Sequence, residues 1–244
     1  MTAVKPAPPA LKPDAALFLD FDGTLAPIMD DPEAVVLETG GDEVLLAVAG
    51  RLGGALAVVS GRDLADLARR VPDGLWRIGN HGLRLAGPAS EIDTGIAGAP
   101  PDLVPALSGI IEKYDGVRLE EKGPVLAVHY RQVPDVGPQL LLELERRLAD
   151  FSDYRLQAGK MVFEAKPSGA NKGRAVAAAM QRAPFAGRVP VMIGDDRTDE
   201  DAFAAVSRLG GWSVKVGEGE SLAEYRLAGH EAVMEYLREA SGAA

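Results

Sequence analysis

Residues 17–28, LFLDFDGTLAPI, begin as an apolar strand and end in two aspartates, a glycine and a threonine. The apolar run starts at Ala15, and its unbroken hydrophobicity predicts a parallel strand over residues 15–21 that is covered on both faces. Asp20 and Asp22 lie at the exit of this strand. Ligands of doubly wound sheets bind beyond the carboxyl ends of the strands, so the two carboxylates stand where a reaction site is expected.

Strand and helix patterns alternate along both ends of the chain. Further strands are expected over residues 55–60, 75–80, 189–195 and 212–217. Helices are expected over residues 42–52, 61–71, 171–183, 198–209 and 230–240. This alternation is typical of α/β proteins with a doubly wound parallel sheet, a Rossmann-like core.

The middle of the chain has a different order, in which two αββ units follow one another. Its helices are expected over 102–113 and 138–150, and its strands over 116–122, 124–131, 154–158 and 161–165. Consecutive strands joined by short turns pair antiparallel. We therefore expect an α+β domain over residues 87–165, inserted into a core made of residues 15–86 and 166–244. The Pro-rich residues 1–14 are expected to form a disordered lead-in and not a signal peptide.

The composition excludes several kinds of partner. The net charge of −10 over 244 residues argues against nucleic acid and anionic membranes, because phosphate groups attract clustered Lys and Arg. No stretch reaches 18 uninterrupted apolar residues, so no segment is expected to span a membrane. The absence of cysteine excludes disulfides and thiolate metal sites and fits a reducing cytosol. We expect a cytoplasmic monomer that acts on a small molecule.

Asp20 and Asp22 have the spacing that phosphoryl transfer through an enzyme carboxylate requires. One carboxylate can attack phosphorus and form an acyl phosphate. A second, two residues later, can protonate the leaving oxygen and then activate water. The alternative is a strand that ends in an Asx-type turn. A calcium loop does not fit, because Gly23 follows directly after the second aspartate.

A second acidic cluster, in GDDRTDEDAF (residues 194–203), follows another expected strand. Acidic oxygens at two strand ends suit Mg²⁺, with Asp195 as the natural ligand. Asp196 and Asp199 could ligate the ion or orient its ligands. The alternative is a helix start at which the dipole favours acidic residues.

Ser60 and Lys172 complete the set of polar residues at strand and helix ends. Ser60 follows the second strand, where its hydroxyl could bind an anion or cap the next helix. Lys172 lies at a helix start, a position that is unfavourable for a cation unless an anion binds there.

In chain order, Asp-x-Asp-Gly-Thr, Ser, Lys and Gly-Asp-Asp-x-x-Asp resemble the motifs of the haloacid dehalogenase superfamily of phosphotransferases. The resemblance implies that Asp20 is the nucleophile and Asp22 the general acid and base. It also implies Mg²⁺ held by Asp20, the backbone carbonyl of Asp22, and Asp195. The implied phosphate-binding residues are Ser60, Gly61 and Lys172.

The inserted domain resembles the type 2 cap of that superfamily, and three segments narrow the resemblance further. LEEKGPVLAVHYR (119–131), VFEAKPSGANKG (162–173) and GDDRTDEDAF are similar to segments of the trehalose-6-phosphate phosphatase family. This implies hydrolysis of trehalose 6-phosphate, a sugar phosphate, in trehalose biosynthesis. The residues implied to contact the sugar hydroxyls are Glu120, Lys122, Arg131, Lys160 and Glu164. Arg84 departs from the family, since many relatives carry an acidic residue two positions after Gly82.

Three alternatives remain open at this stage. The polar sheet face of the insert is also compatible with an ordinary solvated face that carries cross-strand ion pairs. A phosphatase or phosphomutase for another sugar phosphate would carry the same core motifs. A receiver-like signalling domain would be phosphorylated on aspartate, but it has neither an acid two residues on nor an inserted domain of this size.

Overall fold

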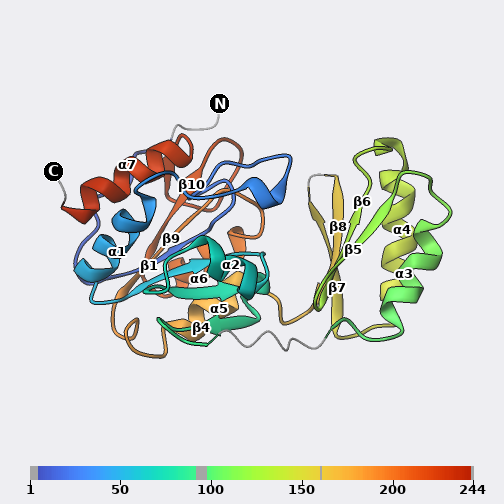
Figure 1. Ribbon diagram of the computed structural model, residues 1–244, viewed down its shortest axis with the longest axis horizontal. Helices are drawn as coiled ribbons and strands as arrows, with labels where there is room; N and C mark the ends of the chain where they lie inside the picture. The colour runs from blue at the N-terminus through green and yellow to red at the C-terminus, as the bar shows by residue number, and fades with distance from the viewer. Residues whose placement is uncertain (1–4, 92–97, 160, 243–244) are drawn as a thin grey trace. The chain divides into compact units, whose positions relative to one another are not determined.

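The computed structural model describes residues 5–91, 98–159 and 161–242. The chain divides into two compact units, one made of Met1–Ile92 and Asn171–Ala244 and the other of Asp93–Ala170 (Figure 1). The second unit begins six residues and ends five residues beyond the limits predicted for the insert, 87–165. Each unit has its own hydrophobic core.

The first unit is built on a seven-stranded sheet with the order β11-β10-β9-β1-β2-β3-β4. The strands are β1 (Ala15–Leu19), β2 (Leu56–Val59), β3 (Trp76–Gly79), β4 (Arg84–Ala86), β9 (Val189–Gly194), β10 (Trp212–Val216) and β11 (Tyr225–Leu227). All neighbours pair in parallel except β4, which is antiparallel to β3. The central strand β1 is buried along its whole length, as its unbroken apolar run predicts.

Helices cover both faces of this sheet. They are α1 (Gly41–Arg51), α2 (Leu64–Arg70), α5 (Lys172–Ala179), α6 (Glu200–Arg208) and α7 (His230–Ser241), with 3-10 turns η1 (Pro32–Ala34) and η2 (Asn80–Gly82). Helix α1 lies beside α7, and α5 lies beside α6 (Figure 1). Right-handed crossovers place the helix between β1 and β2 on one face and the helix between β9 and β10 on the other. The expected doubly wound α/β core is confirmed.

The second unit is a four-stranded antiparallel sheet with the order β5-β6-β8-β7. Its elements are α3 (Leu103–Ile111), β5 (Arg118–Lys122), β6 (Val125–His129), η3 (Pro134–Val136), α4 (Gly137–Leu148), β7 (Tyr154–Gly159) and β8 (Val162–Pro167). Leu107 of α3 and Leu144 of α4 share one buried cluster with Leu126, Val128 and Phe163 of the sheet. The two αββ repeats expected from the sequence are present, and both helices pack on the same, apolar sheet face.

The described part of the N-terminal lead-in, residues 5–14, differs from the expected disorder. The Pro6 carbonyl accepts a hydrogen bond from the Arg226 backbone N–H at 3.0 Å, and the Pro9 carbonyl accepts one from the Tyr236 hydroxyl at 2.8 Å. Strand β11 is the edge of the sheet, and an edge strand offers unpaired backbone groups to a passing segment. Composition alone does not reveal such a partner.

Among the residues that the structure describes, no helix combines the length and the apolar character that crossing a membrane requires.

Candidate active site

Three neighbouring strands of the core sheet deliver polar side chains to one edge. Asp20 follows β1, Ser60 follows β2, and Asp195 follows β9. Leu19 of β1 is in register with Val58 of β2 and with Ile193 of β9. Because these strands are parallel, the residues that follow them emerge at the same carboxyl edge, the usual ligand position in such sheets.

A cluster of three carboxylates lies at this edge. One oxygen each from Asp20, Asp195 and Asp199 lies within 4.8 Å of the others. Gly23 permits the close approach: its φ is +82°, and a Cβ on it would lie 2.3 Å from Oδ2 of Asp195. The Thr24 hydroxyl donates to Oδ1 of Asp195 at 3.4 Å. Clustered carboxylate oxygens are the donors that a small, hard divalent cation prefers, so this set fits a metal ion.

The Lys172 ammonium joins two of these carboxylates. Its Nζ donates to Oδ1 of Asp20 at 2.6 Å and to Oδ1 of Asp199 at 2.7 Å, and all three side chains are buried. Asn171 caps α5 by accepting a hydrogen bond from the Arg174 N–H at 2.9 Å, which sets Lys172 at the helix start. The sequence left the role of Asp199 open, and the structure places it directly on the lysine.

The charges of this cluster perturb one another strongly. Burial raises the pKa of Asp20 well above its usual range, although the Lys172 ammonium acts in the opposite direction. Burial and the Asp196 and Asp199 carboxylates raise the pKa of Asp195 to about 6. Burial would lower the pKa of Lys172, but the Asp199 and Asp20 carboxylates outweigh it and raise that pKa well above its usual range. The cluster therefore holds more negative charge than one lysine neutralises, which favours a cation.

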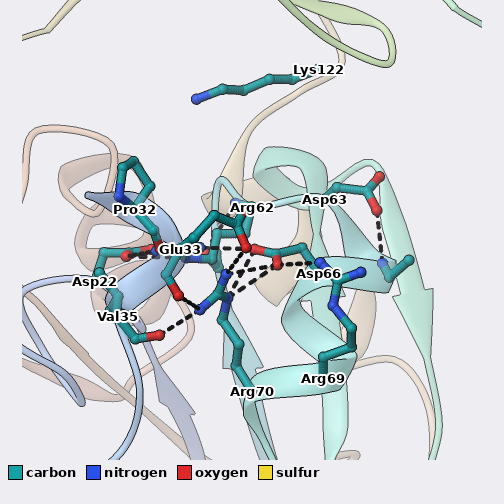
Figure 2. Close-up of polar contacts among 12 residues, drawn as sticks. Asp22, Pro32, Glu33, Val35, Arg62, Asp63, Asp66, Arg69, Arg70 and Lys122 are labelled. Atoms are coloured by element: carbon teal, nitrogen blue, oxygen red, sulfur yellow. Dashed lines mark hydrogen bonds and ion pairs between the residues drawn. The ribbon is translucent and has the colours of Figure 1, made fainter.

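Asp22 does not join this cluster and pairs instead with Arg62. Nη2 of Arg62 donates to Oδ1 of Asp22 at 2.6 Å, and Nε donates to Oδ2 at 2.8 Å (Figure 2). Arg62 was not among the site residues predicted from the sequence. The signal that could have found it is a charged residue in the turn after a buried strand, at the edge where the carboxylates were expected.

Ser60 and Gly61 form the turn that leads from β2 toward α2. Oγ of Ser60 accepts from the Arg62 N–H at 3.0 Å, whereas α2 is capped by Asp63, whose Oδ1 accepts from the Ala65 N–H at 2.8 Å. The alternative that Ser60 caps the helix is therefore wrong. Its hydroxyl hydrogen can still be donated to an anion.

The residues behind this turn adopt a strained backbone. Asn80 and His81 have φ values of +53° and +55°, which for non-glycine residues cost about 1–3 kcal/mol each. The His81 N–H donates to the Ser60 carbonyl at 3.1 Å, and a Cβ on Gly61 would lie 2.5 Å from Cε1 of His81. Glycine is thus required where the turn passes the imidazole ring.

The second unit gathers several of the predicted sugar-binding residues on one sheet face. Glu120 accepts a hydrogen bond from His129 at 2.8 Å, when Nε2 carries the hydrogen, and pairs with Lys122 at 3.3 Å. Burial acts to raise the pKa of Glu120, but His129 and Lys122 outweigh it and lower that pKa. Glu164 lies on the same face as Glu120, because both are in register with Ala127.

Two further predicted residues fall outside these contacts. Arg131 lies two residues beyond β6, and Lys160 lies outside the described residues.

Lys215 of β10, in the core unit, was not predicted. Its buried Nζ donates to the Asp195 carbonyl and, at 2.6 Å, to the Val216 carbonyl, which ties down the turn that carries Asp195.

The doubly wound core and the motifs at its carboxyl edge are those of the haloacid dehalogenase class, to which the relatives of this chain belong. Residues 18–231 match the family described as trehalose-phosphatase. The chain is 42% identical over 234 residues to the trehalose-6-phosphate phosphatase of Escherichia coli K12, covering 94% of this chain and 87% of that protein. It is 41% identical to a probable trehalose-phosphate phosphatase of Sinorhizobium fredii, covering 83% and 77%. The chain belongs to the trehalose-phosphatase family.

The solved structures that share this fold include trehalose-6-phosphate phosphatases. The structure matches that of the C-terminal domain of the C. albicans trehalose-6-phosphate phosphatase with a TM-score of 0.80, covering 99% of each chain at 23% identity. At that identity the match speaks for the fold, and the family membership rests on the sequence relatives.

Proposed function

We propose that this protein hydrolyses trehalose 6-phosphate to trehalose and inorganic phosphate, the final step of trehalose biosynthesis. We infer the substrate from membership of the trehalose-phosphatase family. The observation that carries the chemistry is the buried Asp20 carboxylate, which lies at a strand end and accepts a 2.6 Å hydrogen bond from Lys172. A carboxylate held in this way is an oriented nucleophile beside a fixed positive charge.

The reaction proceeds in two steps on this chain's own residues. Asp20 attacks phosphorus and forms an aspartyl phosphate, while the bond to the sugar 6-oxygen breaks and Asp22 gives that oxygen a proton. Water then attacks the phosphorus, Asp22 takes a proton from the water, and phosphate leaves as Asp20 is regenerated. Hydrolysis of phosphate monoesters is among the slowest uncatalysed reactions, so both carboxylates are required.

The remaining core residues position and neutralise the phosphoryl group. Lys172 and the hydroxyl of Ser60 bind its oxygens, together with the backbone of Gly61. Mg²⁺, held by Asp20, the backbone carbonyl of Asp22, and Asp195, would supply the charge neutralisation on which phosphoryl transfer depends. The carboxylate cluster supports this assignment through its donor atoms and its unbalanced charge.

The polar sheet face of the second unit is proposed to act as a cap that binds the sugar. Its residues for this role are Glu120, Lys122, Arg131, Lys160 and Glu164. What supports the role is that α3 and α4 pack on the opposite face, which leaves paired acids and bases exposed. Such groups match sugar hydroxyls, each of which both donates and accepts. We further propose that the protein works as a monomer in the cytoplasm.

The proposal is tested by measuring phosphate release from a panel of sugar phosphates. We expect trehalose 6-phosphate to give the highest kcat/KM, with loss of turnover in EDTA and recovery on addition of Mg²⁺. A higher value for glucose 6-phosphate or sucrose 6-phosphate would assign a different sugar phosphatase. Transfer to a second hydroxyl without phosphate release would indicate a mutase, and phosphorylation without turnover a receiver domain.

A further inference from the structure

The guanidinium of Arg62 is held in a fixed position from four sides. Besides its pair with Asp22, Nη1 donates to Oδ2 of Asp66 at 2.8 Å and Nη2 donates to the Pro32 carbonyl at 2.9 Å (Figure 2). The guanidinium also stacks on Phe21, with its central carbon 5.6 Å from the centroid of the ring. Only 11% of the Arg62 side chain is exposed, against 36% for Asp22. The arginine is therefore an anchor and Asp22 is the group that it holds.

The two oxygens of Asp22 are not equivalent in this pair. Nη2 donates to Oδ1 at 2.6 Å, and the single Nε hydrogen is shared between Oδ1, at 3.0 Å, and Oδ2, at 2.8 Å; among the described residues Oδ2 accepts no other hydrogen bond. A carboxylate oxygen has two lone-pair positions. Oδ1 thus receives the shortest of these contacts and a share of the Nε hydrogen, whereas Oδ2 receives only its share of that hydrogen and keeps one position on which it can carry a proton.

We propose that Arg62 is a positioning residue that orients the Asp22 carboxylate so that its Oδ2 transfers the proton to the departing sugar oxygen. The inference rests on the proposed function, in which Asp22 is the general acid. Proton transfer requires the two heavy atoms to approach to about 2.6–3.2 Å. A partly exposed aspartate without an anchor would occupy several rotamers and meet that distance only part of the time.

The consequence depends on the leaving group. A sugar alkoxide is a poor leaving group and needs the proton, whereas 4-nitrophenolate leaves readily without one. The value of kcat/KM reports the steps up to the first irreversible one, here the formation of the aspartyl phosphate. The ratio of kcat/KM for trehalose 6-phosphate to kcat/KM for 4-nitrophenyl phosphate therefore isolates the acid step from the later attack of water.

Arg70 of α2 provides a matched control. It binds the same Asp66 at 3.0–3.1 Å and the same loop, through the Val35 carbonyl and Glu33, and its side chain is 6% exposed, but it does not touch Asp22. Arg70→Met removes a buried arginine and its share of this scaffold while leaving the Arg62–Asp22 pair intact. Its ratio of kcat/KM values reports on damage to the scaffold alone.

The experiment measures this ratio for the wild type and for Arg62→Met, Arg62→Lys and Arg70→Met, with thermal unfolding as a check on folding. We expect Arg62→Met to lower the ratio about 10- to 100-fold, part of the roughly 10²–10⁴-fold that general acid catalysis contributes. Arg62→Lys keeps the charge but not the two-pronged contact, so its ratio should lie in between. Arg70→Met should keep the wild-type ratio.

Two outcomes would overturn the proposal: a wild-type ratio in Arg62→Met, which is what equal losses on both substrates would give, or the same fall of the ratio in Arg70→Met. If Arg62→Met does not fold, a wild-type ratio in Arg62→Lys would overturn it. A wild type that releases 4-nitrophenol but not trehalose from its phosphate ester would instead refute the proposed substrate. The Arg62 test then continues with whichever sugar phosphate is turned over.

Discussion

Replacing Lys172 by methionine removes the only positive charge that the structure places on the Asp20 and Asp199 carboxylates among the described residues. Methionine has nearly the same length, so the change deletes the ammonium without leaving a large void. The partners are buried: 6% of the Asp20 side chain and none of the Asp199 side chain is exposed. Removing one partner of a buried ion pair typically costs about 3–5 kcal/mol, and we expect a loss of this size at pH 8 without metal.

The loss should shrink as the pH falls. The pKa values of Asp20 and Asp199 are already raised in the native protein by burial, and removing Lys172 takes away a group that lowers both. The native state of the variant then binds more protons than the unfolded state over the range below the raised pKa values. Stability must therefore rise as pH falls through that range, because the buried carboxylates become neutral.

Urea unfolding of both proteins in EDTA, at intervals from pH 5 to pH 8, measures this difference. Exposed Arg174 lies on the same helix, and Arg174→Met should change the free energy of unfolding by less than about 0.5 kcal/mol at every pH. Added Mg²⁺ should restore part of the stability of the Lys172 variant, because a ligand of the native state alone stabilises it. A loss below about 1 kcal/mol at pH 8, or one that does not depend on pH, would refute this account of the cluster.

Three other changes test the remaining assignments. Asp20→Asn should fold and still bind trehalose 6-phosphate, measured by calorimetry, yet release phosphate at a rate lower by about 10³-fold or more; substantial turnover would mean another nucleophile. Alanine at Glu120 or Glu164 should cut kcat/KM for trehalose 6-phosphate by about 10-fold or more and leave 4-nitrophenyl phosphate nearly unaffected, whereas equal losses would remove the proposed sugar contacts. Gly23→Ala should weaken activation by Mg²⁺, because its Cβ would lie 2.3 Å from Oδ2 of Asp195 at a φ of +82°, and an unchanged Mg²⁺ titration would contradict this.

The parts of the fold that the sequence predicts are those with a strong local pattern. The unbroken apolar run before Asp20 can be satisfied only by burial on both faces, and it forms the central strand β1. The antiparallel repeats of the second unit follow from short turns between alternating strands. Strands β4 and β11 have three residues each, too few for a period to be seen, and the path of residues 5–14 depends on an edge that forms only when the sheet does.

The site likewise has a part that the sequence predicts and a part that it does not. Strand periodicity puts Asp20, Ser60 and Asp195 at strand ends, and parallel register brings those ends to one edge. The contacts of Arg62 and Asp199 depend on side-chain directions around two turns. An arginine in the turn after a strand is a candidate, but it looks the same in a sequence whether it reaches Asp22 or extends into water, so spacing alone does not establish the contact.

The charge at the sheet edge explains how an acidic protein can accept an anionic substrate. Asp20, Asp195 and Asp199, when ionised, leave a formal charge of −2 after Lys172 is counted. Two like charges 4 Å apart repel by about 4 kcal/mol at an effective dielectric constant of 20, so a phosphate dianion would be excluded from the bare cluster. A dication at the carboxylates would reverse this balance and would leave Lys172 free to hold Asp20, the proposed nucleophile. Burial, together with repulsion from Asp196 and Asp199, raises the pKa of Asp195 to about 6, and this pKa should fall when a divalent ion binds.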